Sequence, residues 1–269
     1  MSFINHLNKI IDVISALDGV LSIGKSGGEA LPERDGVDID LFIFCDEVPI
    51  LAARNAAFAN VDAPISIINF SEKPGRFWGV CDFAVLDTVD LCLMYFTIES
   101  MDEEIVSVLD GRRIDKEDGY FYPTGRCATF LTMHALCDKA AYIAKMKDKL
   151  SNYPDGLSKK IISYHIKKIY DDEDFQRAAI RRDVLFYHSV LETALDHYLQ
   201  ALFALNKCYF PGRKRSIQYV NLFEIKPLNC AERLLNVIGL GSKSDTISQS
   251  CVEWASLCRD LSCVINNGS

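Results

Sequence analysis

The chain of 269 residues has no apolar run long enough to cross a membrane. Runs such as residues 91–96 stop far short of the roughly 20 apolar residues that a membrane-spanning helix needs. Residues 1–17 carry polar and charged side chains between apolar ones, which is typical of an amphipathic helix and not of a signal peptide. We therefore expect a cytoplasmic protein that makes no membrane contact.

The sequence also has no CxxC pair. Its ten cysteines are scattered, most of them inside apolar or periodic segments. Such cysteines are typical of free thiols that pack as small hydrophobic side chains in a reducing compartment. The pattern favours neither disulfides nor a zinc site made of thiolates.

Basic residues are too few for a general nucleic-acid surface. The formal net charge is −8 at pH 7, whereas a surface that binds nucleic acid without regard to sequence needs an excess of Lys and Arg to neutralise phosphates. A small, neutral or cationic acceptor therefore fits the chain better than a nucleic acid. A homodimer is left open.

No internal repeat or low-complexity segment is present, and the first hundred residues alternate between helical and strand patterns. Residues 4–17 have helical periodicity, and three short β-rich runs follow at 20–23, 39–44 and 65–70. Two more β-rich runs, 78–86 and 89–96, are separated by two residues and predict a hairpin with a tight turn.

The second half is dominated by helical periodicity after a polar segment at residues 110–125. We expect helices at about 128–150, 157–170, 180–202, 230–238 and 244–265. The predicted fold class is α+β: a mixed sheet with helices over residues 1–115, followed by an all-α helical bundle over residues 116–269.

Residues 19–26, GVLSIGKS, match the G-x-x-x-x-G-K-[ST] pattern of a P-loop. In a P-loop the Lys and Ser open a helix whose N-terminus faces phosphate. Here the four middle residues are strand formers, and Gly27, Gly28 and Pro32 follow where that helix should be. The context therefore favours a strand followed by a glycine-rich turn.

On this interpretation the segment consists of a strand, the turn GKSGG at residues 24–28, and a second strand that contains Asp38 and Asp40 as D-x-D. This arrangement resembles the nucleotidyltransferase superfamily that includes DNA polymerase β and the kanamycin and lincosamide nucleotidyltransferases. GKS replaces the more usual GGS, and Val37 stands where a Ser often precedes the first Asp. The resemblance implies transfer of a nucleoside monophosphate from a nucleoside triphosphate, the co-substrate, to an acceptor hydroxyl.

The spacing of the two aspartates has a physical reason of its own. Side chains alternate along a strand, so Asp38 and Asp40 project from one face. Two carboxylates on one face suit Mg²⁺, and a pair of Mg²⁺ ions can clamp the attacking and leaving oxygens of an in-line displacement. Gly24 and Gly27 would let backbone amides approach a phosphate, and Lys25 and Ser26 could donate to its oxygens.

Members of this superfamily usually carry a third acidic residue on a neighbouring strand, and Asp90 is the best match. Its apolar surroundings make an unpaired charge costly unless a metal ion accepts it. Asp82, on the other arm of the predicted hairpin, is the rival. Asp46 and Glu47 are expected to end the D-x-D strand in a solvated turn.

Two further assignments lie in the helical half. His188, Glu192 and Asp196 follow at intervals of four and predict a polar line along a helix. The kanamycin enzyme takes its general base, a glutamate, from its helical half, and Glu192 is the candidate by position. Lys214, beyond that helix, could reach triphosphate oxygens, although a cationic helix end explains it equally well.

Two alternatives remain open. Arg182, Asp183 and His188 spell R-D-x-x-x-x-H, which resembles the motif of HEPN ribonucleases, helical enzymes that cleave RNA without metal. Alternatively, the chain is a nucleotide-binding regulator, for example of the toxin–antitoxin type, whose site binds without transfer. The other histidines, His165 and His197 among them, show no ligand spacing.

Overall fold

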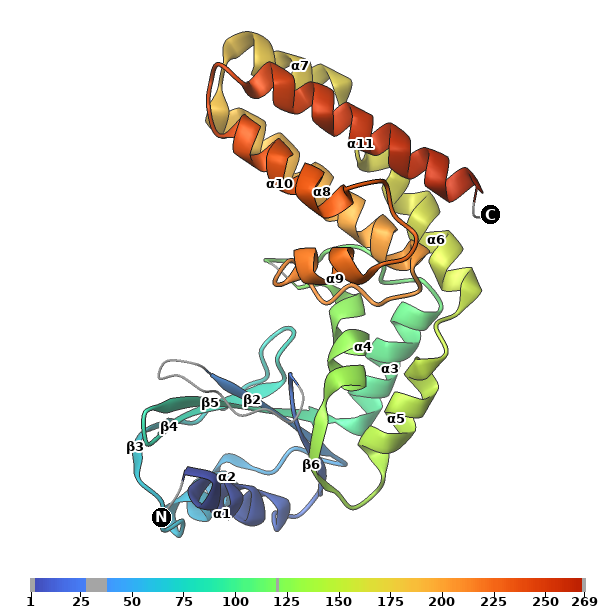
Figure 1. Ribbon diagram of the computed structural model, residues 1–269. Helices are drawn as coiled ribbons and strands as arrows, with labels where there is room; N and C mark the ends of the chain where they lie inside the picture. Colours follow the sequence, from blue (N-terminus) through green and yellow to red (C-terminus); the bar gives the residue numbers. More distant parts are fainter. Residues whose placement is uncertain (1–2, 28–37, 120, 268–269) are drawn as a thin grey trace. The chain divides into compact units, whose positions relative to one another are not determined.

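The computed structural model describes residues 3–27, 38–119 and 121–267. It divides into two compact units (Figure 1), one of residues 1–108 and 126–152 and one of residues 109–125 and 153–269. The fold class is α+β, as predicted, with the sheet in the first unit and helices in the second. The boundary expected between residues 115 and 116 stays a prediction.

The first unit contains a mixed sheet. Its described strands are β1 (Val20–Lys25), β2 (Ile39–Cys45), β3 (Ile65–Asn69), β4 (Val80–Leu86), β5 (Val89–Thr97) and β6 (His134–Asp138). Their order across the sheet is β3-β4-β5-β2-β1-β6. Among these strands β2 and β5 run parallel, and the other neighbours run antiparallel.

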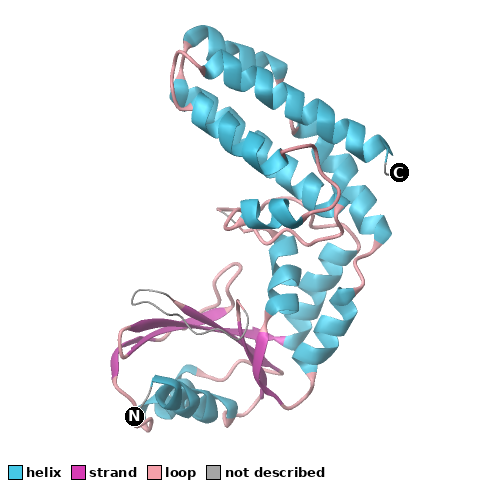
Figure 2. Ribbon diagram, in the orientation of Figure 1, coloured by secondary structure: helices cyan, strands magenta, loops and turns pink. Residues whose placement is uncertain are grey.

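Helices lie along one face of this sheet and pack against only one end of the other face (Figure 2). Alternate residues of β2, beginning with Ile39 and Leu41, are buried in a core that includes α1 (Phe3–Ser15) and Phe58 of α2 (Leu51–Ala59). On the opposite face the ring of Phe44 lies 5.1 Å from that of Phe130 and 5.0 Å from that of Tyr142. Phe130 belongs to α4 (Pro123–Thr132) and Tyr142 to α5 (Tyr142–Ser151). Both helices follow α3 (Ile98–Leu109) in the chain.

Short-range patterns predicted most of this unit correctly. The β4–β5 hairpin is confirmed, and its turn contains Asp87, whose φ is 55°. The helix expected over residues 128–150 is wrong, because α4 and α5 are separated there by β6. β6 has five residues, too short for a pattern to distinguish a strand from a helix in an apolar stretch. The helices α2 and α3 were not predicted.

The second unit is helical. It contains α6 (Asp155–His165), the 3₁₀-helix η1 (Ile166–Lys168), α7 (Asp172–Arg181), α8 (Val184–Leu205), α9 (Ser216–Leu222), α10 (Cys230–Gly241) and α11 (Ile247–Asn267). Its core gathers side chains from α7, α8, α10 and α11 around the fully buried Trp254, whose ring lies 5.2 Å from that of Tyr198.

The long helix begins later than predicted. Arg182 adopts a left-handed conformation that ends α7, and the Asp183 side chain accepts a hydrogen bond from the backbone amide of Phe186, 3.0 Å away, which caps α8. Ile180, expected on the apolar stripe, lies in α7 and is 81% exposed. The predicted start at residue 180 is therefore wrong, and the Arg182–His188 pattern spans the junction of two helices.

Within the described residues, no helix is both long and apolar enough to span a membrane. All ten cysteines are free thiols, as expected from their scattered positions.

Candidate active site

Three predicted carboxylates lie on one face of the sheet. Asp40 of β2 is in register with Cys92 of β5, and Asp90 stands two residues before Cys92. Paired residues share a face and side chains alternate, so Asp40 and Asp90 point to the same side, as does Asp38 immediately before β2. Strand spacing and rise put the Cα atoms of Asp40 and Asp90 about 8 Å apart.

The electrostatics of Cys92 agree with this register. A hydrogen bond with Cys81 and burial raise the pKa of the Cys92 thiol, and the negative charges of Asp40 and Asp38 raise it further. Asp38 is exposed, whereas Asp40 and Asp90 are half-buried. The carboxylates of Asp38, Asp40 and Asp90 therefore lie near the start of β2 and remain accessible to solvent.

The rival carboxylate, Asp82, lies on the other face. It is in register with Leu93, it is fully buried, and it forms an ion pair with Arg54 of α2. The backbone amide of Ser71 also donates to its Oδ1 over 3.0 Å. Asp82 is thus part of the hydrophobic core and is turned away from Asp40.

The described part of the glycine-rich turn, residues 24–27, is hydrogen-bonded to the start of β2. Ser26 donates its backbone amide to the carbonyl oxygen of Asp40 over 3.0 Å, and its hydroxyl to Oδ2 of Asp40 over 3.4 Å. Gly27 has a φ of +77°, which favours glycine. Lys25 is the last residue of β1, and Ser26 and Gly27 form a turn, so the P-loop interpretation is wrong. Gly28 lies outside the described residues.

Gly24 and Lys25 have different surroundings from those expected. A Cβ on Gly24 would lie 2.2 Å from Sδ of Met133, the residue between α4 and β6, so the absence of a side chain here makes room for that of Met133. Lys25 is buried and in register with Leu41, on the face opposite Asp40. The predicted contact between Lys25 and a phosphate stays a prediction. The register does not favour it, because Lys25 and Asp40 lie on opposite faces of the sheet.

The remaining predicted residues lie in the helical unit. Glu192 is half-buried and lies 3.5 Å from Nη1 of Arg213, and Lys214 is exposed in the turn before α9. Their roles as general base and phosphate contact stay predictions.

Asp196 is buried and does not continue a solvent-facing polar line along α8. Tyr122 and Arg213 donate to its Oδ1 over 2.6 Å each, and Lys116 donates to its Oδ2 over 2.9 Å. Asp196 therefore joins the segment of residues 109–125 to α8.

One cluster of potential metal ligands in the helical unit was not predicted. Asp115, His165 and His197 place their potential ligand atoms within 4.8 Å of one another. They come from three segments of the helical unit. Ligand spacing along the sequence could not reveal it, because only the packing of α6 on α8 brings these residues together.

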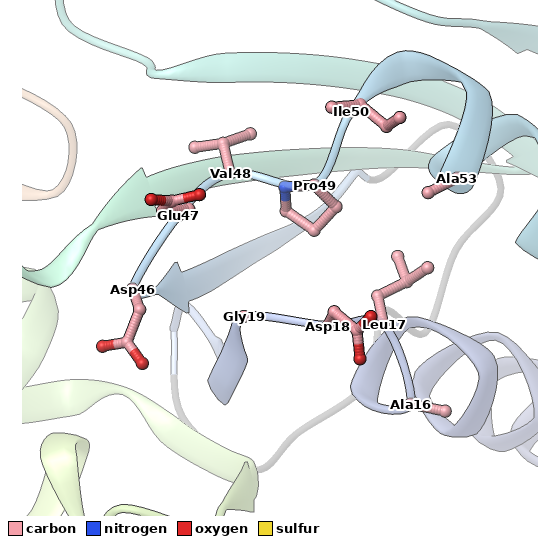
Figure 3. Close-up of a pocket in the computed structure, with 10 residues that line it drawn as sticks. All are labelled: Ala16, Leu17, Asp18, Gly19, Asp46, Glu47, Val48, Pro49, Ile50 and Ala53. Carbon is pink, nitrogen blue, oxygen red and sulfur yellow. The ribbon is translucent and has the colours of Figure 1, made fainter.

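A separate hollow of about 650 Å³ opens at the other end of β2 (Figure 3). It is lined by residues of the turn between α1 and β1 and by the segment after β2, including Asp46 and Glu47. These two carboxylates are exposed, as predicted for a solvated turn. They belong to the end of β2, whereas Asp38 and Asp40 belong to its beginning.

Comparisons with known proteins find distant similarity. A family model described as a domain of unknown function, DUF4037, matches residues 123–215, less than half of the chain. A solved structure described as a nucleotidyltransferase-like protein from Exiguobacterium sibiricum has 10% sequence identity and a TM-score of 0.47, over 95% of this chain and 74% of that chain. No curated protein matches the chain.

Proposed function

We propose that this chain is a metal-dependent nucleotidyltransferase that moves a nucleoside monophosphate from a nucleoside triphosphate to an acceptor hydroxyl. The observation that carries the proposal is the pairing of Asp40 with Cys92 in the parallel β2–β5 register. It gives Asp38, Asp40 and Asp90 a common face. A small acceptor suits the net charge of −8 better than a nucleic acid.

The three carboxylates fit Mg²⁺ by their chemistry. They are hard oxygen donors, and the cost of holding like charges together falls when a cation lies between them. Two Mg²⁺ ions bound there would polarise the phosphate and stabilise the attacking and leaving oxygens. Asp38, Asp40 and Asp90 would hold these ions from one side, and oxygens of the triphosphate would complete their coordination.

The turn after β1 suits the triphosphate. The backbone amide of Ser26 is bonded to the Asp40 carbonyl and holds the residue beside the carboxylates. Its hydroxyl, 3.4 Å from Oδ2 of Asp40, would turn from that oxygen to donate to a phosphate oxygen. In the reaction the acceptor oxygen forms a bond to the α-phosphorus, the bond to the bridging oxygen breaks, and pyrophosphate leaves. The acceptor proton passes to a base.

Pyrophosphate release tests the proposal. The purified chain is incubated with Mg²⁺ and each of ATP, GTP, CTP and UTP in the presence of a panel of hydroxylated acceptors. We expect release with at least one pair, and a loss of at least about 100-fold in Asp40→Asn, since even outer-shell partners of a metal are worth 10- to 100-fold. Asp46→Asn is the matched control on the same segment and should keep the activity.

The same experiment addresses a regulator that only binds. Mg²⁺-dependent nucleotide binding by the native chain that Asp40→Asn abolishes, without pyrophosphate release from any pair, would favour the regulator over the transferase. Equal pyrophosphate release by the native chain and Asp40→Asn would overturn the proposed site.

A further inference from the structure

The cluster of Asp115, His165 and His197 lies wholly within the helical unit. His165 ends α6, His197 lies in the middle of α8, and Asp115 belongs to the segment between α3 and α4. His165 is fully buried, and His197 is 9% exposed. The Nδ1 atoms of the two rings are 2.8 Å apart.

Hydrogen bonding determines which atom of His165 is available. Its Nε2 lies 2.9 Å from the carbonyl oxygen of Ile114. A carbonyl can only accept, so Nε2 carries the proton. The lone pair of His165 therefore sits on Nδ1 and faces His197.

This arrangement has the usual features of a metal-binding histidine. Such a ring commonly donates its other N–H to a backbone carbonyl, which orients the ring and selects the tautomer. The Ile114 carbonyl does this for His165, and it comes from the residue next to Asp115. The same short segment thus orients one ligand and supplies another.

We propose that Asp115, His165 and His197 bind a divalent transition-metal ion of the Zn²⁺ class, distinct from the Mg²⁺ of the proposed active site. Two imidazoles and one carboxylate suit Zn²⁺, whereas Mg²⁺ prefers oxygen ligands alone. Three protein ligands leave a fourth position for water. The ion would join the segment of residues 109–125 to α6 and α8.

Binding requires small adjustments around the cluster. Two nitrogens at about 2.0–2.1 Å from a tetrahedral zinc lie roughly 3.3 Å apart, so the rings must separate by about 0.5 Å. His197 must also move its ring proton from Nδ1 to Nε2. Asp115 now accepts from the Tyr164 hydroxyl over 2.9 Å and lies 3.7 Å from Nζ of Lys168. The Lys168 side chain is 42% exposed, so it can swing into solvent.

The test is metal binding by the full chain after treatment with a chelator. Zn²⁺ is titrated against a chromophoric chelator, and Co²⁺ serves as a second probe because its visible spectrum reports nitrogen and oxygen ligands in a tetrahedral site. We expect one site per chain, little displaced by millimolar Mg²⁺. Asp115→Asn and His197→Asn should each weaken binding by at least about 100-fold, more than the loss of an outer-shell partner.

Matched variants separate this site from other causes. His188→Asn changes another histidine of α8 outside the cluster and should bind Zn²⁺ as the native chain does. Asp40→Asn should also keep Zn²⁺ affinity, so this test does not depend on the proposed transferase activity. Circular dichroism checks that each variant is folded. Zn²⁺ binding of equal strength in folded His197→Asn would place the ion elsewhere, for example on cysteine thiols, and overturn the proposal, as would no binding by the native chain.

Discussion

Asp82 and Asp90 are neighbours on one hairpin, yet we expect their loss to have opposite consequences. Asp82→Asn keeps the shape of the side chain but leaves the guanidinium of Arg54 buried without its countercharge. Breaking a buried ion pair from one side costs about 3–5 kcal/mol. Two hydrogen bonds of Arg54 remain, from Nε to the Pro49 carbonyl over 3.0 Å and from Nη2 to the Ser71 carbonyl over 2.7 Å, but neither replaces a charge.

Hydrogen exchange of the backbone amides of β4 and β5 measures this cost locally. At about 1.4 kcal/mol for each tenfold change, exchange through opening of the sheet should accelerate by roughly 100- to 5,000-fold in Asp82→Asn. Asp90→Asn, on the half-buried opposite side, should change stability by less than about 0.5 kcal/mol, as surface substitutions do. It should abolish nucleotidyl transfer instead.

A double variant completes the experiment. Replacing Arg54 by Met and Asp82 by Leu removes both charges and fills the space with apolar side chains, which is often neutral or stabilising for a buried pair. We expect exchange close to that of the native chain. Native-like exchange in Asp82→Asn alone would refute the reasoning, because it would mean that the charge of Asp82 does not hold Arg54 in the core.

Further predictions concern the glycine-rich turn and the core of the helical unit. Gly24→Ala should lower stability by about 1–3 kcal/mol in urea unfolding, because its Cβ would overlap the Met133 side chain. Lys25→Gly should keep measurable pyrophosphate release at temperatures where the variant is folded, since Lys25 does not share the face of the carboxylates. Gly27→Val should lose most of that activity, because a branched residue is strained at a φ of +77°. Asp196→Asn should destabilise the helical unit by about 2–4 kcal/mol in urea unfolding, because three donors converge on its buried carboxylate.

Local periodicity in the sequence was enough to identify β2 and the β4–β5 hairpin. Alternation along a strand also put Asp38 and Asp40 on one face before any partner strand was known. Both features depend on residues close together in the chain, where the period of the backbone decides which side chains share a side. The start of the long helix was predicted wrongly for a related reason. The apolar spacing of α8 continues back to residue 180, although the helix is interrupted at Arg182.

The tertiary structure alone decided which strand lies beside β2, and with it the choice between Asp90 and Asp82. β2 pairs with β5, and the alternation of β5 and β4 gives Asp90 the face of Asp40 and sends Asp82 into the core. Likewise, only packing shows that Gly24 makes room for Met133, and that His165 and His197 meet. A sequence pattern states which face a residue takes along its own element. It does not state which distant element covers that face, because that choice depends on packing between segments far apart in the chain.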